Sequence, residues 1–216
     1  MRAKKVAAKQ ESLLEAAASQ WANAEQIHIP MMPTPLGSQP SPYIRAAWRD
    51  HPYGKTRSVK AASLHNGDEI FFRLEWNDPE KNDVLTDSAF PDGAAVLFPM
   101  RADAPILTMG DKDHPVNAWH WRADLGEHGR SNVARGVGTT VLSDKSRVTC
   151  RASWDKGVWR VVICRPLSIP DQAVESVQLR PGQDMRFGVA MWEGQNGERA
   201  GIKAFSPTWH PMTIEA

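Results

Sequence analysis

The sequence has few of the features that identify common classes of protein. It holds two cysteines, Cys150 and Cys164, too few for an all-cysteine zinc site or an iron–sulfur cluster. No apolar run approaches the roughly 18 residues of a transmembrane helix. The 26 basic and 25 acidic residues nearly balance, so no charge excess indicates a nucleic-acid or anionic-membrane partner. The basic amino terminus has no apolar segment, and we expect no Sec signal peptide.

The usual catalytic motifs are also absent. There is no glycine-rich phosphate loop, no Gly-x-Ser-x-Gly and no His-Glu-x-x-His. His114 and His120 are six residues apart, a spacing that suits no standard metal motif. Asp111, Asp113 and Asp124 are interpreted as solvated turn residues rather than calcium ligands. These absences favour a binding or carrier module over a hydrolase or transferase.

What the sequence does have is a succession of short strand patterns. Residues 69–76 alternate with period two, which is typical of a half-buried strand, and Asn66-Gly67 before them is a hairpin turn. A second hairpin turns at 155–157. The expected strands are 57–64, 69–76, 94–98, 116–122, 147–154, 158–165, 185–192 and 202–206. Because no long helical pattern separates them, the sequence predicts an all-β antiparallel β-sandwich with short helical and irregular insertions.

The amino-terminal part has a different composition. Residues 10–25 contain good helix formers, and residues 29–42 contain five prolines, which exclude helix and central strand. We therefore divide the chain into an arm and proline-rich strap (1–42) and a sandwich domain (43–216). The composition of the first part suggests that it wraps a neighbouring subunit.

Cys150 and Cys164 lie at nearly mirror-image positions about the 155–157 turn. A disulfide between neighbouring strands is one interpretation. A register shift of one residue would put the two side chains on opposite faces, and two buried thiols are the default expectation.

One loop is shaped to present a particular side chain. After the strand at 94–98, prolines and glycine restrict the backbone around Met109 and Gly110, ahead of a strand that carries Trp119 and Trp121. Met109 is therefore a candidate ligand. The alternative is that it fills a gap in the core, as most methionines do.

Five groups of residues, in this order, resemble one family. They are residues 63–67 leading into 72–76, Phe98-Pro99, Met109-Gly110 with 115–124, residues 154–167, and residues 198–206. Together they resemble the haem b-binding gamma subunit of ethylbenzene dehydrogenase and the gamma subunits of dimethyl sulfide dehydrogenase, selenate reductase, chlorate reductase and steroid C25 dehydrogenase. The resemblance spans about residues 58–206. The loop around Met109 is most similar to the hydrocarbon- and steroid-hydroxylating branch.

The resemblance implies one b-type haem held between the sheet and its loops. Its motifs map the axial ligands onto Met109 and Lys203, with Met100 as the alternative methionine. Trp119, Trp121 and Phe205 would pack near the porphyrin, although core packing explains them equally well. These three aromatic residues complete the predicted cofactor site.

A lysine can ligate iron only as the neutral amine, which burial and the ferric charge favour. A haem with two strong axial ligands carries electrons rather than binding oxygen or substrate. Because Cys-x-x-Cys-His is absent, the haem would be non-covalent. Ligation by histidine would need His65, His114 or His120, each of which we expect in a turn or at a strand edge.

The resemblance also implies partners. The chain would be a non-catalytic electron-transfer subunit beside an alpha subunit with molybdopterin and a beta subunit with iron–sulfur clusters, and a cytochrome c would be a suitable external acceptor. It would be periplasmic, exported with a signal-bearing partner, with cytoplasmic residence as the alternative. Two other functions fit a tryptophan-rich sandwich: a non-haem carbohydrate- or ligand-binding module, whose aromatics stack on sugars, and a cytochrome sensor with an open iron position.

Overall fold

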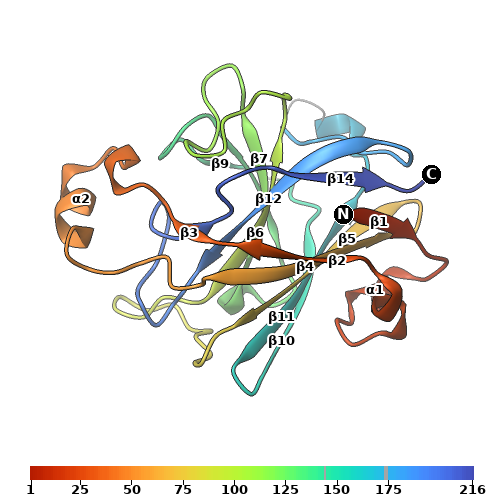
Figure 1. The fold of residues 1–216 in the computed structure, drawn as a ribbon, viewed down its shortest axis with the longest axis horizontal. Helices are drawn as coiled ribbons and strands as arrows, with labels where there is room; N and C mark the ends of the chain where they lie inside the picture. The colour runs from red at the N-terminus through yellow and green to blue at the C-terminus, as the bar shows by residue number, and fades with distance from the viewer. Residues whose placement is uncertain (144, 173–174) are drawn as a thin grey trace.

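The fold is built from short strands joined by irregular loops (Figure 1). It is taken from a computed structural model that describes residues 1–143, 145–172 and 175–216. The strands are β1 (Arg2–Lys5), β2 (Gln26–Pro30), β3 (Met32–Pro33), β4 (Ser58–His65), β5 (Glu69–Asn77), β6 (Gly93–Pro99), β7 (Val116–Arg122), β8 (Arg130–Ala134), β9 (Val141–Leu142), β10 (Thr149–Asp155), β11 (Val158–Pro166), β12 (Asp184–Trp192), β13 (Ala204–Phe205) and β14 (His210–Ile214).

Helices are few and short. They are α1 (Gln10–Leu14), α2 (Pro42–Trp48) and the 3-10 turns η1 (Ser19–Asn23), η2 (Leu36–Ser38), η3 (Ala123–Leu125) and η4 (Pro170–Gln172). Ser41 caps α2, its hydroxyl accepting a hydrogen bond from the Ile44 amide, and Pro42 occupies the first turn, where no amide hydrogen is needed. In the described residues, no helix has the length and apolar character needed to cross a membrane.

The strands follow the order β10-β11-β5-β4-β1-β14-β12-β6-β7-β8-β9, with β2 paired to β4, β13 to β12 and β3 to β13. The predicted all-β class is confirmed, and its major hairpins are antiparallel. One difference is β1, which runs parallel to both β4 and β14, so the sheet is mixed. The predicted strands all appear, with bounds shifted by at most two residues; β1, β2, β3, β8, β9 and β14 were not predicted.

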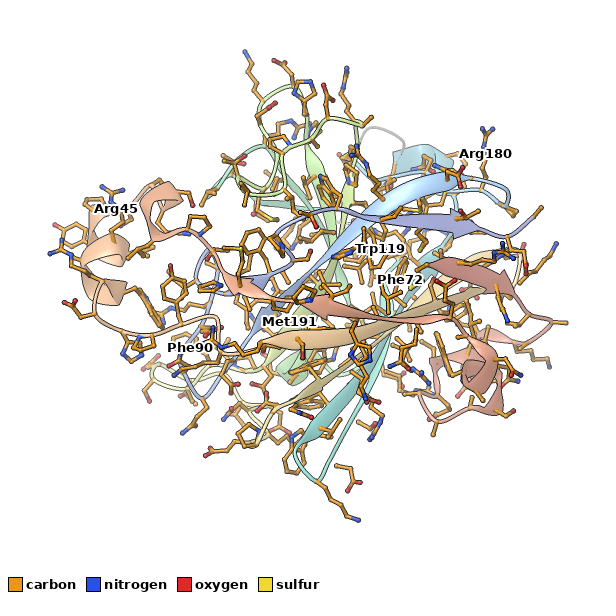
Figure 2. All side chains as sticks on the ribbon, in the orientation of Figure 1. Arg45, Phe72, Phe90, Trp119, Arg180 and Met191 are labelled. Carbon is orange, nitrogen blue, oxygen red and sulfur yellow. The ribbon has the colours of Figure 1, made fainter. Side chains whose placement is uncertain are left out.

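A cluster of aromatic side chains joins two layers of this sheet. Phe72 of β5 lies 5.5 Å from Phe98 of β6, 6.0 Å from Trp119 of β7 and 5.6 Å from Phe187 of β12, measured between ring centres. Figure 2 shows Phe72 and Trp119 at the centre of the molecule. Each such ring buries about 150–250 Å², and this cluster therefore forms the middle of the core.

The side chains of β7 alternate between the core and the opposite face of the layer to which this strand belongs. Trp119 and Trp121 are buried in the core, whereas Ala118, His120 and Arg122 point to the other side. The alternation follows from the period of two along a strand. Register with β6 is set by the pairs Val96–Trp119 and Ala95–His120.

The amino-terminal segment lies within the sandwich. Strand β1 fills the position between β4 and β14. Leu13, Leu14 and Trp21 pack with Phe71 in a second buried cluster, on the face of β5 opposite Phe72. The sequence predicts an arm that wraps a neighbouring subunit; in the structure these apolar residues cover this chain's own sheet, which would otherwise expose Phe71. The first part of the proline-rich strap is extended, as predicted, and β2 lies along the edge of β4. The prediction that its prolines exclude helix is wrong at two places, η2 and the start of α2. Pro35 and Pro42 lie at or before the first residue of these helices, where no amide hydrogen is needed.

Cys150 and Cys164 are both free and buried. The register pairs Cys150 with Ile163 and Cys164 with Thr149. The two cysteines are therefore offset by one residue and do not lie directly opposite each other. They therefore point to opposite faces, Cys150 into the central core and Cys164 toward the cluster around Trp21. The default expectation of two buried thiols is confirmed.

We expect Phe72→Ala to lower the free energy of unfolding by about 3–5 kcal/mol, because it removes a ring that contacts three others. Urea unfolding checks this. The control Val141→Ala, at a side chain 63% exposed, should change stability by less than about 0.5 kcal/mol. A loss below about 1 kcal/mol for Phe72→Ala would mean that the layers do not depend on this cluster.

Candidate functional site

A pocket of about 260 Å³ lies on the outer face of the β12–β6–β7–β8 layer, between the sheet and the loops above it. The strands contribute four small residues to its floor, Gly93 and Ala95 of β6, Ala118 of β7 and Ala134 of β8, beside larger ones that include Leu97, His120, Asn132 and Trp192. The small residues leave part of the sheet surface open to a flat ligand. The walls come from loops at 85–91, 136–140 and 198–203.

Met109 enters the pocket from a strained loop. Its φ is 57°, in the left-handed region that residues other than glycine seldom adopt. Gly110 follows with φ of 83°, and a Cβ there would lie 2.6 Å from the carbonyl oxygen of His114. Strain of this kind persists only where the surrounding structure holds it, and it gathers at functional sites.

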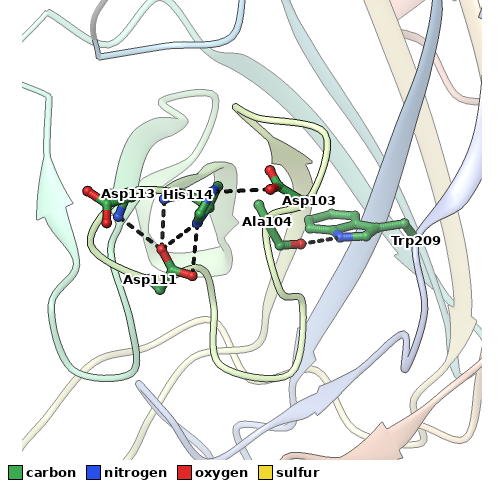
Figure 3. A network of polar contacts seen from close by, with 6 residues as sticks. All are labelled: Asp103, Ala104, Asp111, Asp113, His114 and Trp209. Carbon is green, nitrogen blue, oxygen red and sulfur yellow. Dashed lines mark hydrogen bonds and ion pairs between the residues drawn. The ribbon is translucent and has the colours of Figure 1, made fainter.

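Polar contacts fix this loop (Figure 3). The His114 ring lies between two carboxylates, with Nδ1 2.8 Å from Asp111 and Nε2 3.2 Å from Asp103. The indole of Trp209 donates a hydrogen bond to the carbonyl oxygen of Ala104 at 2.8 Å. The carbonyl oxygen of Met109 accepts from the Gly136 amide at 3.2 Å. The loop is therefore tied to the rest of the protein on both sides of the methionine.

Lys203 lines the same pocket, just ahead of β13. Its side chain is almost entirely buried, and burial lowers the pKa of its amine from the ordinary 10.5 to about 8. The amine donates a weak hydrogen bond to the Ala200 carbonyl oxygen at 3.4 Å and lies 5.5 Å from the centre of the Trp192 ring. A buried amine that loses its proton this readily can act as a metal ligand.

His120 is a pocket residue that sequence reasoning misplaced. The prediction that it sits in a turn or at a strand edge is wrong, since it lies inside β7, paired with Ala95 and Arg130. Burial, together with the charges of Arg122, Arg130 and Lys203, lowers its pKa to about 4, so the imidazole is neutral at pH 7. The signal was available in the sequence, because His120 alternates with the two core tryptophans and must share the opposite face.

The other predicted site residues lie around the pocket rather than in it. Trp119 and Trp121 belong to the central core, because β7 turns them away from the pocket. Phe205 is buried in a cluster on the pocket side of the layer, against which Met109 packs. Met100 lines a separate depression with Lys112 and Arg135. Of the histidines, His65 is buried at the end of β4 and His114 is held in the Met109 loop.

Two arginines and the rings of Phe90 and Trp192 also line the pocket. Arg122 donates to both carboxylate oxygens of Asp124, including a 2.8 Å bond from Nη2. The guanidinium of Arg199 lies 4.2 Å from the centre of the Phe90 ring. The pocket thus combines small apolar residues with a thioether, an amine of lowered pKa, a neutral imidazole and two guanidinium groups.

The profile of the ethylbenzene dehydrogenase family matches residues 18–141 and 134–204. The chain belongs to the ethylbenzene dehydrogenase family. It is 36% identical to the chlorate reductase subunit gamma of Ideonella dechloratans over 71% of this chain and 64% of the relative. It is 30% identical to a putative respiratory nitrate reductase heme subunit of Haloferax mediterranei over 84% of this chain and 63% of that protein.

A third relative in this family, the dimethylsulfide dehydrogenase subunit gamma of Rhodovulum sulfidophilum, is 27% identical over 88% of this chain and 71% of its own length. The chain spans less than two thirds of the length of the first two relatives.

Solved structures share the fold at low identity. A putative carbohydrate-binding protein from Bacteroides uniformis aligns with a TM-score of 0.59 at 11% identity, over all of this chain and 98% of that one. A family 9 carbohydrate-binding module from Caldicellulosiruptor kristjanssonii, in complex with glucose, aligns with a TM-score of 0.51 at 11% identity, over all of this chain and 96% of the module. This likeness confirms the β-sandwich fold.

We expect Lys203→Met to stabilise the ligand-free protein at pH 7, because the unfolded chain holds the lysine proton more tightly than the folded one. Burying the charged amine opposes folding below about pH 8, and this cost fades as the pH rises toward 10.5. The gain should be at most about 3 kcal/mol at pH 7 and much smaller at pH 10. Urea unfolding at both pH values measures it.

The matched control is Lys112→Met, at an exposed lysine on the loop that carries Met109. It should show no such gain at either pH. An equal gain in stability for Lys203→Met at pH 7 and pH 10 would mean that the gain does not come from removing the charge of the buried amine.

Proposed function

We propose that this chain is an electron-transfer gamma subunit of an oxidoreductase complex and binds one non-covalent b-type haem in the pocket on the β6–β7 face. The observation that carries the proposal is the convergence of Met109 and Lys203 on one pocket from distant parts of the sequence. The relative named as a heme subunit supports the choice of cofactor.

The residues of the pocket fit such a group. The small side chains of the floor leave room for a flat ring against the sheet, and Met109 is presented by a loop whose strained backbone is fixed by its neighbours. In this proposal Met109 supplies a thioether to the iron, a ligand that favours the ferrous state and raises the potential. The strained backbone of Met109 would then hold its sulfur atom in the position needed to bind the iron.

Lys203 supplies the second ligand in this proposal. To bind iron, its buried amine must lose one proton, and desolvation already lowers the pKa of this amine to about 8. The neutral imidazole of His120 beside it adds no positive charge to oppose a ferric iron. Arg122 and Arg199 have the chemistry that binds carboxylates, and they would suit the propionate groups of a haem.

When bound, a haem with two protein ligands would accept and release single electrons and leave no position for oxygen or substrate. The relatives named as gamma subunits support a place in a larger complex. We propose partners of the kind that the family resemblance implies: a molybdenum-containing alpha subunit, an iron–sulfur beta subunit and an external acceptor such as a cytochrome c. Periplasmic residence, through export with a signal-bearing partner, belongs to the same proposal.

We expect the purified protein to show the absorption and low-temperature EPR spectra of a low-spin, six-coordinate b haem. Met109→Ala and Lys203→Ala should each convert the haem to a high-spin form or lose it, because each removes an axial ligand. Pyridine haemochrome analysis gives the haem content per chain, so that loss and spin change are distinguished.

Two variants serve as matched controls. Met100→Ala removes the other methionine of the same loop, which lies outside the pocket, and should leave the spectrum unchanged. His120→Gln tests the rival nitrogen ligand and should keep a low-spin haem. A low-spin spectrum that survives Lys203→Ala but not His120→Gln would transfer the ligand role to the histidine, and a preparation without any Soret band would overturn the haem proposal.

A further inference from the structure

Behind one wall of the pocket lies a group of three buried acids, Asp78, Asp92 and Glu193, here called the carboxylate cluster. Asp78 follows β5, Asp92 precedes β6 and Glu193 follows β12. Their side chains are 1%, 0% and 8% exposed. One carboxylate oxygen of each lies within 4.8 Å of the others. The three acids, each next to the end of a different strand, therefore lie close together.

Asp92 is held in place by donors from three segments. Its Oδ2 accepts hydrogen bonds from the Asn82 amide at 2.8 Å and the Trp159 indole at 3.0 Å, and its Oδ1 accepts from the Gly194 amide at 2.9 Å. The packing there is close, because a Cβ on Gly194 would lie 2.2 Å from the Phe90 carbonyl oxygen. Asp92 is therefore held in position by two backbone amides and one indole.

A second observation concerns the remaining oxygens. Among the described residues, Oδ2 of Asp78 and Oε1 of Glu193 are buried without a hydrogen-bond partner, and so is Oδ1 of nearby Asn82. Burying such an oxygen without a partner costs several times what a normal hydrogen bond contributes. These oxygens are ready to accept a positively charged or hydrogen-donating partner.

The cluster also lacks a compensating charge. Within residues 1–143, 145–172 and 175–216, none of the ion pairs includes any of the three acids. A bound cation would supply the missing positive charge and remove the repulsion between the three carboxylates.

We propose that the carboxylate cluster is a calcium site that ties together the ends of β5, β6 and β12. All the available donors are oxygens, the ligands of hard cations. Calcium–oxygen distances of about 2.3–2.6 Å allow ligand oxygens to lie up to about 5 Å apart, and one oxygen of each acid lies within 4.8 Å of the others. Magnesium keeps several waters in a strict octahedron, so a buried cluster of carboxylates favours calcium.

The site would brace the pocket without taking part in it. Asp92 lies between Pro91 and Gly93, and Glu193 follows Trp192; these three neighbours all line the pocket. A calcium ion at the cluster would hold the 90–93 and 192–194 segments in position. This inference does not depend on haem binding, and its test needs none.

The test uses the full-length protein and calcium itself. After dialysis against a chelator, we expect millimolar Ca²⁺ to raise the melting temperature by several degrees, and Mg²⁺ to raise it much less. Asp78→Asn and Glu193→Gln should weaken calcium binding at least tenfold, measured by isothermal titration. In the chelator, each of these variants should melt no lower than the wild type, because each removes repulsion within the cluster.

A second measurement does not depend on melting. Terbium substitutes for calcium and emits when a nearby tryptophan is excited, and Trp159 donates directly to Asp92. We expect emission that saturates near one equivalent, is displaced by Ca²⁺ and is lost in Glu193→Gln. Glu80→Gln, at an exposed acid two residues from Asp78, is the matched control and should retain both responses.

Three results would overturn the proposal. The first is the absence of any calcium-dependent shift and of any sensitised emission in the wild type. The second is a binding response that survives both cluster variants unchanged. The third is an equal response to Mg²⁺, which would contradict the assignment to calcium.

Discussion

The core and the pocket of this protein both depend on the alternation of side chains along β7. Trp119 and Trp121 point inward and join the two layers, while Ala118 and His120 point outward and shape the pocket. Pairing with β6 and β8 on both sides fixes the register. A slip of one residue would put the indoles into the pocket and the imidazole into the core. Stability and binding are therefore specified by the same strand.

Two residues of the pocket are in energetically unfavourable states. Met109 has a left-handed backbone, and Lys203 has a buried amine. Neither arrangement is favourable locally, and each persists because the surrounding contacts offset its cost. The contacts of His114 and Trp209 restrain the Met109 loop, and the aromatic core beneath supplies a rigid base. Strained residues of this kind are common at sites that bind a ligand in a fixed geometry.

The comparisons illustrate how a fold and a site are separable. Carbohydrate-binding proteins share the sandwich at 11% identity, which identifies the layers and nothing about the ligand. The family match instead covers residues 18–204, which include all the residues that line the pocket, from Leu85 to Lys203. In this chain, the outer face of the β6–β7 layer brings small side chains of the sheet together with a methionine loop and a buried lysine.

The elements with a local signal could be predicted from the order of residues alone. The period-two pattern at residues 69–76 and the turn at 155–157 are set by neighbours along the chain, and the family motifs selected Met109 and Lys203. Three features became visible only in the folded chain: β1 lies inside the sheet, His120 faces the pocket, and Asp78, Asp92 and Glu193 converge. These features depend on register and on contacts between residues far apart, because a strand's pattern gives two faces without saying what will cover each.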